Sequence, residues 1–513
     1  MDFCRSPEGG RRLRRRKLTE STTNTADGIW SARFLAITVA NLTVVAIAAF
    51  DGLAVVAALP SIAADLGRID LLPWVITAYL ATSSVAVVVA GPVIDAIGVR
   101  RTFRITGSWF CLSTVLVAVA PTMPLLIAAR LVQGLGGGLV IAVALASVGL
   151  AYPHTLRPAA FAANSMVWGV MGFGGPALAG LLLVVADWRL VFAIQIPITL
   201  VALAAGWRTL PTVEGQGRRP SVDVGGVMWV ALLVAGSLLA VGEAGSGALL
   251  TVAAVGLTAA AGVGYWRHAG RSGDPVVRRD HLRRFPLGII HVSTGVVLIA
   301  GLASDNYLPI YVQVVRGGSE AFAAFTLVFL TVGWTIGAIA FARAPSAWPE
   351  NRTTLIGASL MVPALIVVLS AFLIEAPLWV LFVGYFTVGL SIGLVSTSGI
   401  TWMQRETPES EMGRVNAAHQ FVRNLCITYA VAIGGAILLG VVDARTGDVE
   451  SVRRILAGEE TMVSGATVEA VADGVTLTVA VALMFSVMAL VFVIRSYRRG
   501  GRQLINPTLQ VGN

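Results

Sequence analysis

The chain of 513 residues is 56% hydrophobic and 13% charged, with a mean hydropathy of +0.80, whereas a typical soluble domain has about 25% charged residues. This composition excludes a soluble enzyme and indicates many membrane crossings of about 20 residues each. The net charge of +9 would suggest nucleic-acid binding in a soluble chain. Because the charge is concentrated in short segments between apolar runs, we expect no nucleic-acid partner.

The rare residue types exclude two further classes of function. The single lysine, Lys17, lies in a polar tail, so the chain lacks the Gly-Lys pair with which a Walker A loop holds nucleotide phosphates. The cysteines Cys4, Cys111 and Cys426 are far apart and match no metal or disulfide framework. We therefore expect no ATP-driven motor of that type, no metal site and no cofactor.

Apolar runs of about 17 to 25 residues predict transmembrane helices, and the chain contains fourteen such runs. The predicted fold class is an all-α integral membrane protein. The predicted spans are 34–59, 74–94, 104–120, 124–150, 159–185, 190–206, 224–241, 249–265, 287–311, 321–342, 354–374, 378–400, 417–439 and 475–494.

The distribution of basic residues predicts the orientation, because positively charged loops stay in the cytoplasm. With the N-terminus inside, 29 of the 37 Lys and Arg residues fall on the inner side, 6 fall on the outer side and 2 lie within spans. We therefore expect both termini in the cytoplasm. The basic run Arg11–Lys17 is expected to orient the chain and to contact anionic lipids. A nucleic-acid-binding arm is the alternative.

The loop after the second predicted span carries a motif of charged residues and glycines. Gly91, Asp95 and Gly98 are followed by the basic pair Arg100 and Arg101. An acid at the end of one helix, a turn glycine and a basic pair can form a charge latch against the terminus of a neighbouring helix. An ordinary positive loop is the alternative.

This loop resembles the G-x-L-a-D-r-x-G-r-k signature of the major facilitator superfamily. Three further stretches resemble its fourteen-span drug:H+ antiporter family, the multidrug and quaternary-ammonium exporters. They are Asp51 before Leu59-Pro60, the pattern Arg130-x-x-Gln133-Gly134, and the run Gly172 to Gly180 of the fifth span with Gly175, Pro176 and Gly180 as its antiporter element. Trp188 to Pro197 resembles a fourth element of the family, with Gln195 in place of its asparagine.

The resemblance implies two six-helix halves with an inserted pair of helices between them. The expected organisation is a basic tail 1–33, an N-terminal half 34–209, a linker with inserted helices 210–285, a C-terminal half 286–495 and a tail 496–513. The resemblance also implies a proton-coupled exporter of small amphipathic or cationic compounds that works by alternating access. We expect a monomer in the inner membrane of a bacterium, with protons and membrane lipids as its other partners.

Three of the charged residues within predicted spans stand out as functional candidates: Asp51, Arg130 and Asp305. A charge inside a membrane is costly and is therefore a functional hypothesis. All three lie about 9 to 12 Å below the outer ends of their spans. The resemblance places Asp51 opposite Arg130, so that movement of the arginine would change the proton affinity of the acid. A static pair that only holds two helices together is the alternative.

Other candidates are weaker. We expect Gln133, Trp168, Asn306 and Trp334 to line the substrate cavity. For the aromatic residues, an ordinary packing or membrane-interface position is the leading alternative. Arg423 lies six residues into the span 417–439, where it would either meet Asp95 or reach for the membrane surface. His291 and His419, near inner span ends, are candidate proton relays.

Two alternatives to drug export remain open at this point. One is export of an endogenous lipid or secondary metabolite, and the other is a receptor or scaffold that keeps the fold without transporting anything. An enzyme is not expected, because no span carries paired catalytic histidines or carboxylates.

Overall fold

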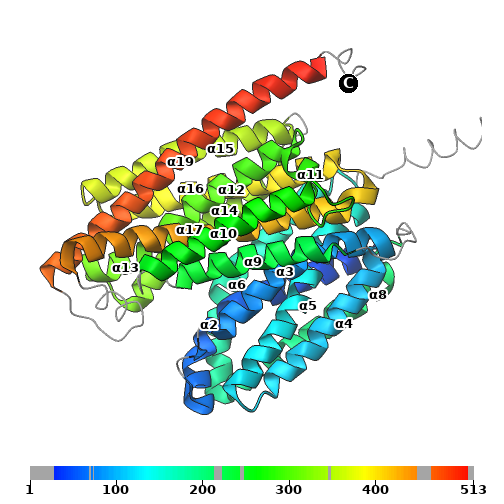
Figure 1. Ribbon diagram of the computed structural model, residues 1–513, viewed down its shortest axis with the longest axis horizontal. Coiled ribbons are helices and arrows are strands. Elements are labelled where there is room, and N and C mark those ends of the chain that lie inside the picture. The colour runs from blue at the N-terminus through cyan, green and yellow to red at the C-terminus, as the bar shows by residue number, and fades with distance from the viewer. Residues whose placement is uncertain are drawn as a thin grey trace, which may run out of the picture.

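The computed structural model describes residues 28–68, 71–72, 74–212, 222–242, 248–344, 348–447 and 464–505, and all regular elements in these ranges are helices. The basic run Arg11–Lys17 lies outside the described residues. Below, the inner and outer ends of helices are named after the predicted orientation. Figure 1 shows the first half, in blue and cyan, beside the second half, in green to red.

Each predicted span overlaps a helix of the structure. The first half comprises α2 (Leu35–Leu66), α3 (Trp74–Ile97), α4 (Val99–Ala118), α5 (Met123–Ala151), α6 (Arg157–Val185), α7 (Trp188–Ala193) and α8 (Gln195–Thr209). The inserted hairpin is α9 (Val224–Gly242) and α10 (Ala248–Ala269), followed by the short α11 (Arg279–Arg283). The second half comprises α12 (Leu287–Asp305), α13 (Leu308–Ile310), the π-helical turn η2 (Tyr311–Val315), α14 (Glu320–Ala342), α15 (Glu350–Leu373), α16 (Leu378–Glu406), η3 (Glu409–Glu411), α17 (Met412–Thr446) and α19 (Gly465–Ile505).

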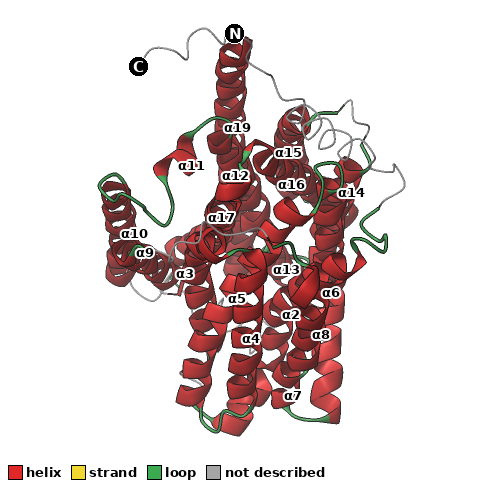
Figure 2. Cartoon of the chain, turned by 90° about the vertical axis from the view of Figure 1, so that its right-hand side faces the viewer, coloured by secondary structure: helices red, strands yellow, loops and turns green. Residues whose placement is uncertain are grey.

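Ten helices among the described residues are long and apolar enough to cross a membrane, or eleven when the two arms of α6 count as one span. The chain is therefore a multi-pass membrane protein, and the count of fourteen spans stays a prediction. Helix α4, for example, carries three arginines within its first six residues. The inserted hairpin lies at the edge of the bundle (Figure 2), where α9 contacts α3 of the first half and α17 of the second.

Prolines divide some of the predicted spans. The two arms of α6, Arg157–Gly172 and Gly174–Val185, are bent by 43°. Pro176 has no N–H to donate to the carbonyl of Gly172 one turn earlier, which is a common cause of such bends. The predicted span 287–311 ends as a regular helix at Asp305 and continues through α13 and η2, where Pro309 again removes a donor.

Glycines allow the same close packing in both halves. In α5, a Cβ on Gly134 or Gly138 would collide with backbone carbonyl oxygens of α3. In α16, a Cβ on Gly389 or Gly393 would collide with backbone carbonyl oxygens of α14. Two small residues four positions apart bring helix backbones into contact. The fourth helix of each half therefore packs against the second helix of that half in the same way.

The apolar core is continuous across the two halves only toward the inner side. One cluster combines first-half residues such as Val44 and Val143 with second-half residues such as Ile290 and Ala418. A second cluster consists only of residues from the second half, and a third, which includes Phe50 and Trp188, only of residues from the first half. The halves therefore share a core at their inner ends and have separate cores elsewhere.

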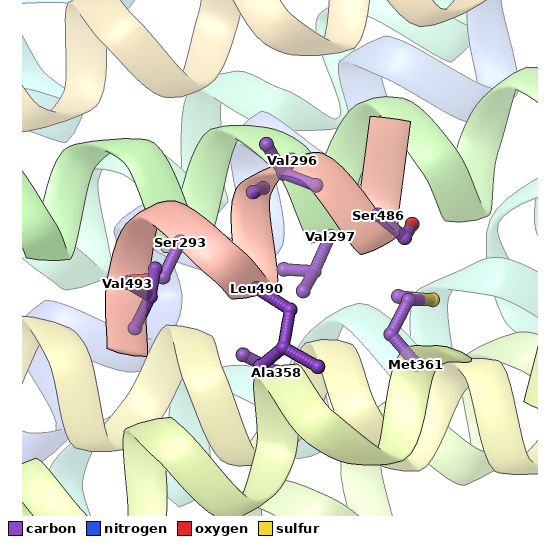
Figure 3. Close-up of a pocket in the computed structure, with 9 residues that line it drawn as sticks. Ser293, Val296, Val297, Ala358, Met361, Ser486, Leu490 and Val493 are labelled. Carbon is purple, nitrogen blue, oxygen red and sulfur yellow. The ribbon is translucent and has the colours of Figure 1, made fainter. Parts of the chain in front are cut away.

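The second half is also tightly packed between α12, α15 and α19. Figure 3 shows an enclosed space lined by Ser293, Met361 and Ser486, with a volume of about 10 Å³. This volume is enough for about one water molecule. The hydroxyls of both serines already donate to carbonyls of their own helices. This space is therefore a packing gap and not a substrate site.

Candidate functional site

A buried ion pair joins α2 to α5 in the first half. Nη1 and Nη2 of Arg130 donate to Oδ1 and Oδ2 of Asp51 at 2.8 and 3.0 Å, and each residue is 1% exposed. Two parallel charge-assisted bonds are stronger and more directional than one. The structure therefore brings together the two residues that the resemblance placed on facing helices. Their role in proton coupling stays a prediction.

Further hydrogen bonds tie the pair to α5 itself and to two neighbouring helices. Nη1 of Arg130 also donates to Oε1 of Gln133 at 2.6 Å, and Nε donates to the carbonyl of Val75 on α3 at 3.0 Å. Nε2 of Gln195 on α8 donates to Oδ1 of Asp51 at 3.2 Å. Burying both charges is costly unless such additional bonds are made. The pair is thus enclosed by four helices of the first half.

Aromatic rings cover the arginine, and Gln133 is buried beside it. The guanidinium carbon of Arg130 lies 4.3 Å from the centre of the Tyr79 ring and 5.4 Å from that of Phe192, within the range of cation–π attraction. Gln133 is completely buried and donates to the hydroxyl of Thr114 at 3.0 Å. Gln133 therefore supports the ion pair and lines no open cavity in this conformation.

The second half holds a buried carboxyl group that has no cationic partner among the described residues. Asp305, at the end of α12, is 5% exposed, and its Oδ1 accepts no hydrogen bond from the described residues. The hydroxyl of Tyr385 on α16 lies by the side chain of Ser304 and interacts electrostatically with Asp305. Tyr385 is the eighth residue of α16, as Arg130 is the eighth residue of α5. A neutral tyrosine thus occupies the position that the arginine has in the first half.

At the inner end, Asp95 of α3 contacts the first turn of α17. Its Oδ1 and Oδ2 accept hydrogen bonds from the backbone N–H groups of Gly413 and Arg414 at 2.9 and 3.3 Å. A carboxylate is favoured there by the unpaired N–H groups and by the helix dipole. The helices approach closely because Gly91 has no side chain: a Cβ there would lie 2.7 Å from Cα of Arg414. We call the contact of Gly91 and Asp95 with Gly413 and Arg414 the inner seam.

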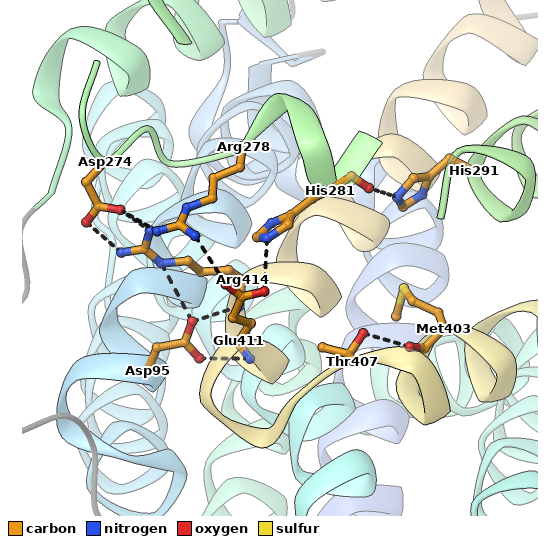
Figure 4. Close-up of polar contacts among 10 residues, drawn as sticks. Asp95, Asp274, Arg278, His281, His291, Met403, Thr407, Glu411 and Arg414 are labelled. Carbon is orange, nitrogen blue, oxygen red and sulfur yellow. Dashed lines mark hydrogen bonds and ion pairs between the residues drawn. The ribbon is translucent and has the colours of Figure 1, made fainter. Parts of the chain in front are cut away.

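The linker after the inserted hairpin adds to the inner seam, as Figure 4 shows. The side chain of Arg414 pairs with Asp274 of this linker, and its Nε lies 3.6 Å from Oδ2 of Asp95. Nη1 of Arg278 donates to Oε1 of Glu411, just before α17, at 3.1 Å. The inserted segment is therefore tied to the same helix start as α3.

Other residues of the predicted latch lie elsewhere. Gly98 has φ of 82°, a conformation that favours glycine, and it forms the turn into α4. Nε of Arg100 donates to the carbonyl of Leu210 at the end of α8 at 2.5 Å, so Arg100 caps a helix of its own half. Arg101 is exposed. Arg423 is nine residues beyond Arg414, or about 14 Å along the helix, and it does not reach Asp95.

The predicted cavity residues are dispersed. Trp168 of α6 is 46% exposed, and Trp334 of α14 packs against the core of the second half. Asn306 is exposed and bonds to the carbonyl of Leu302, one turn earlier in α12. The described residues therefore do not gather these side chains around one pocket.

The antiporter element follows the bend of α6. Gly175 is buried, whereas Pro176 and Gly180 are exposed, and a Cβ on Gly180 would meet no atom within 4 Å. The inner arm of α6 contacts α14, since the hydroxyl of Thr335 donates to the carbonyl of Ser165 at 3.3 Å. The bend therefore separates an inner arm that contacts the second half from an outer arm whose residues Pro176 and Gly180 are exposed.

Comparison with known proteins identifies the family of the chain. Residues 42–431 match the Major Facilitator Superfamily. The chain belongs to this superfamily. A probable multidrug-efflux transporter of Mycobacterium tuberculosis strain H37Rv is 30% identical over 352 residues, which cover 64% of this chain and 71% of that relative. The superfamily consists of transporters, in agreement with the prediction that the chain is not an enzyme.

Solved structures of other transporters have a similar fold. A bacterial homologue of the iron transporter ferroportin in its outward-facing state superposes with a TM-score of 0.62 at 10% identity, over 90% of this chain and 98% of that one. The human organic anion transporter MFSD10 superposes with a TM-score of 0.60 at 14% identity, over 89% and 100% of the two chains. These likenesses establish the fold alone.

Some residues at the contact between the major facilitator halves were not predicted. Arg157, at the start of α6, is 5% exposed. It donates to the carbonyl of Gln404 on α16 at 3.0 Å and to that of Gly149 at the end of α5 at 2.5 Å. Nε2 of Gln404 donates in turn to the carbonyl of Leu145 at 3.2 Å. An arginine between two predicted spans is the signal that would have pointed to this contact.

The two predicted histidines do lie together. Nδ1 of His291 on α12 and Nδ1 of His419 on α17 are 3.1 Å apart, and Nε2 of His291 is 3.0 Å from the carbonyl of His281. A carbonyl only accepts, so Nε2 of His291 carries hydrogen and His419 donates between the rings when both are neutral. Their role as a relay stays a prediction.

Proposed function

We propose that the chain is a proton-coupled exporter of small amphipathic or cationic compounds. The observation that carries this proposal is the buried ion pair of Asp51 and Arg130, held within hydrogen-bond distance by two helices of the first half. The name of the relative from M. tuberculosis supports multidrug efflux as the transport activity. Because buried charges in a membrane are costly, a pair of this kind is expected to serve function as well as packing.

Asp51 would exchange its proton as its contact with Arg130 is made and broken. The ionised acid is stabilised by Arg130 and by the amide of Gln195. When helix movement withdraws the arginine, a carboxylate left in an apolar site is strongly favoured to take up a proton. Binding of a cationic compound near the ionised acid would compete with that proton. Such competition gives exchange rather than leakage.

Asp305 is proposed as a second proton-binding group. Among the described residues it has no cationic partner, and its neighbour Tyr385 is a neutral hydroxyl. A buried carboxyl group in such surroundings is stable chiefly as the neutral acid.

Alternating access is supported by the distribution of contacts between the halves. Every hydrogen bond between described residues of the two halves lies toward the inner side: they are those of Asp95, Arg157, Gln404 and Thr335. The apolar core joins the halves in the same region and is separate elsewhere. We infer a conformation that is closed at the inner side and open toward the outer side. Release of the inner seam would allow the opposite state.

The setting proposed for this cycle is the inner membrane of a bacterium. The distribution of 29 inner and 6 outer basic residues supports cytoplasmic termini. One chain supplies both six-helix halves, so a monomer is sufficient for transport. Reporter fusions at the two termini that are active only outside the cytoplasm test the orientation, and active fusions would contradict it.

The test uses the purified full-length chain in lipid vesicles that carry a pH gradient, with ethidium, a planar lipophilic cation, as the probe. We expect ethidium to collapse the gradient when wild-type protein is present. Asp51→Asn should abolish this effect, whereas Asp51→Glu should retain part of it. Asp65→Asn is the matched control, because Asp65 lies on the same helix and pairs with Arg189 near the outer surface.

Two results would contradict the proposal in different ways. No collapse with wild-type protein would exclude export of this cation by proton exchange. Normal collapse with a well-folded Asp51→Asn variant would remove Asp51 as the coupling group and leave Asp305 to be tested by the same substitution.

A further inference from the structure

The inserted hairpin carries an open groove at its inner end. The groove has a volume of about 660 Å³ and is formed by α9, α10 and the residue stretch just after α10. Its lining changes in character along α10, from small apolar residues to basic ones. It is lined by Trp229, Ala259, Ala260, Val263, Gly264, Arg267, His268 and Arg271.

The apolar part of this groove continues into exposed apolar side chains on α10, one of the predicted spans. Val263 is 52% exposed, and Val252, Val255 and Leu257, which come earlier in α10, are also exposed. Such a run of exposed apolar side chains on a membrane helix is expected to contact acyl chains. Trp229 lies beside Gly264, where a Cβ would lie 2.5 Å from the indole ring. The absent side chain at Gly264 thus leaves room for the indole at the groove wall.

The two arginines of the groove have no acidic partner among the described residues. The carboxylate of Asp223 is 2.7 Å from His268. Asp223 therefore pairs with the histidine and not with either arginine. Arg267 and Arg271 are exposed, and no ion pair joins either of them to a described acid. Two arginines one turn apart at the inner end of a predicted membrane helix match the charge of a phosphate group at the membrane surface.

We propose that this groove binds one anionic phospholipid of the inner leaflet. The phosphate lies between Arg267 and Arg271, and the acyl chains follow α10 past Val263 with Trp229 at the groove wall. The apolar continuation of the groove favours a lipid over a soluble phosphate compound. The site is independent of the ion pair between Asp51 and Arg130, so it stands or falls separately from the proposed transport activity.

The hairpin that carries this groove also contacts both halves. Helix α9 contacts both α3 and α17, which meet at the inner seam. The hydroxyls of Ser237 on α9 and Tyr429 on α17 lie 3.0 Å apart. A lipid in the groove at the inner end of the hairpin is therefore placed near the contact between the halves without being part of it.

The experiment measures quenching of tryptophan fluorescence by phospholipids with brominated acyl chains, in vesicles containing the full chain. The chain has 12 tryptophans, so the signal of Trp229 is the difference between wild type and Trp229→Phe. We expect brominated phosphatidylglycerol to quench this difference signal more strongly than brominated phosphatidylcholine. The double variant Arg267→Gln/Arg271→Gln should weaken the preference roughly tenfold or more, given the contribution of each basic residue.

The matched control is Arg208→Gln/Arg352→Gln, which removes the same charge from exposed inner positions outside the groove. It should leave the preference unchanged. Equal quenching by the two lipids would overturn the proposal, as would an unchanged preference in Arg267→Gln/Arg271→Gln. Displacement of phosphatidylglycerol by millimolar inorganic phosphate would assign the groove to a soluble anion and would also overturn it.

Discussion

The backbone N–H of Gly413 on α17 donates to Oδ1 of Asp95 on α3 at 2.9 Å, so an acid from one half caps a helix of the other. The contact requires glycines on both sides. A Cβ on Gly413 would lie 2.5 Å from that same oxygen and 2.9 Å from the carbonyl oxygen of Gly91. The inner seam therefore depends both on the charge of Asp95 and on the close approach of two helix backbones. Loss of the charge or addition of a methyl group at either glycine should weaken it.

Asp95→Asn should weaken the inner seam. The variant loses the charge that interacts with the N-terminus of α17, an effect of about 0.5 to 2 kcal/mol. We expect lower thermal stability of the purified protein and faster labelling of a cysteine introduced in place of Leu145, which lies at the inner contact. Asp280→Asn, at an exposed position on α11, is the control. Equal labelling rates in both variants would show that Asp95 does not close this side.

Gly91→Ala should be more disruptive than a glycine-to-alanine change usually is. Its new methyl group would lie 2.7 Å from Cα of Arg414, a backbone atom that cannot rotate away, so the helices must separate at a cost of about 1 to 3 kcal/mol. Gly440→Ala on α17 meets no atom within 4 Å and should be neutral or slightly stabilising. Unfolding measured in a denaturant series distinguishes the two. Equal stability of the variants would mean that α3 and α17 are not in tight contact.

Asp51→Asn should destabilise the protein by about 3 to 5 kcal/mol, because it leaves the buried guanidinium of Arg130 without its counter-charge. Arg130→Gln should have a similar effect. The double variant Asp51→Asn/Arg130→Gln should be more stable than either single variant, since neither charge is then left unpaired. Equilibrium unfolding of the four proteins gives the coupling energy. Simple additivity of the two single effects would contradict a direct interaction.

Acidification should destabilise the contact around His281. Burial lowers the pKa of His281 below its ordinary value of 6.5, although the carboxylate of Glu411 acts in the opposite direction. The unfolded chain therefore takes up a proton at this position before the folded chain does, so stability contributed by the neutral ring is lost as the pH falls below about 6.5. Arg278 and Arg414 also face the ring and disfavour its protonated form.

His281→Gln should accordingly reduce the loss of thermal stability between neutral pH and pH 5. The wild type and the variant are compared over a series of buffers at constant ionic strength. The same slope in both proteins would show that another group is responsible for the effect of acid.

The sequence was sufficient for predictions that depend on local properties. The apolar runs predicted the helical membrane-spanning fold, because only a helix satisfies its backbone hydrogen bonds within a membrane without partners from other segments. The motif around Asp95 predicted contact with a helix terminus, and the charges at positions 51 and 130 stood out because burial of unpaired charge is costly. The resemblance then placed both residues on facing helices.

Only the tertiary structure decided which of these groups meet. The spacing along the chain gives no distance between α3 and α17, so it suggested Arg423 as a partner of Asp95 and gave no sign that the backbone of Gly413 and Arg414 lies there instead. It did not indicate that Gln133 accepts a hydrogen bond from Arg130. It also gave no sign that Asp305 lies near Tyr385, or that Arg267 and Arg271 border a groove. Helical periodicity specifies the environment of each face, whereas the choice of neighbour depends on packing between helices that are hundreds of residues apart.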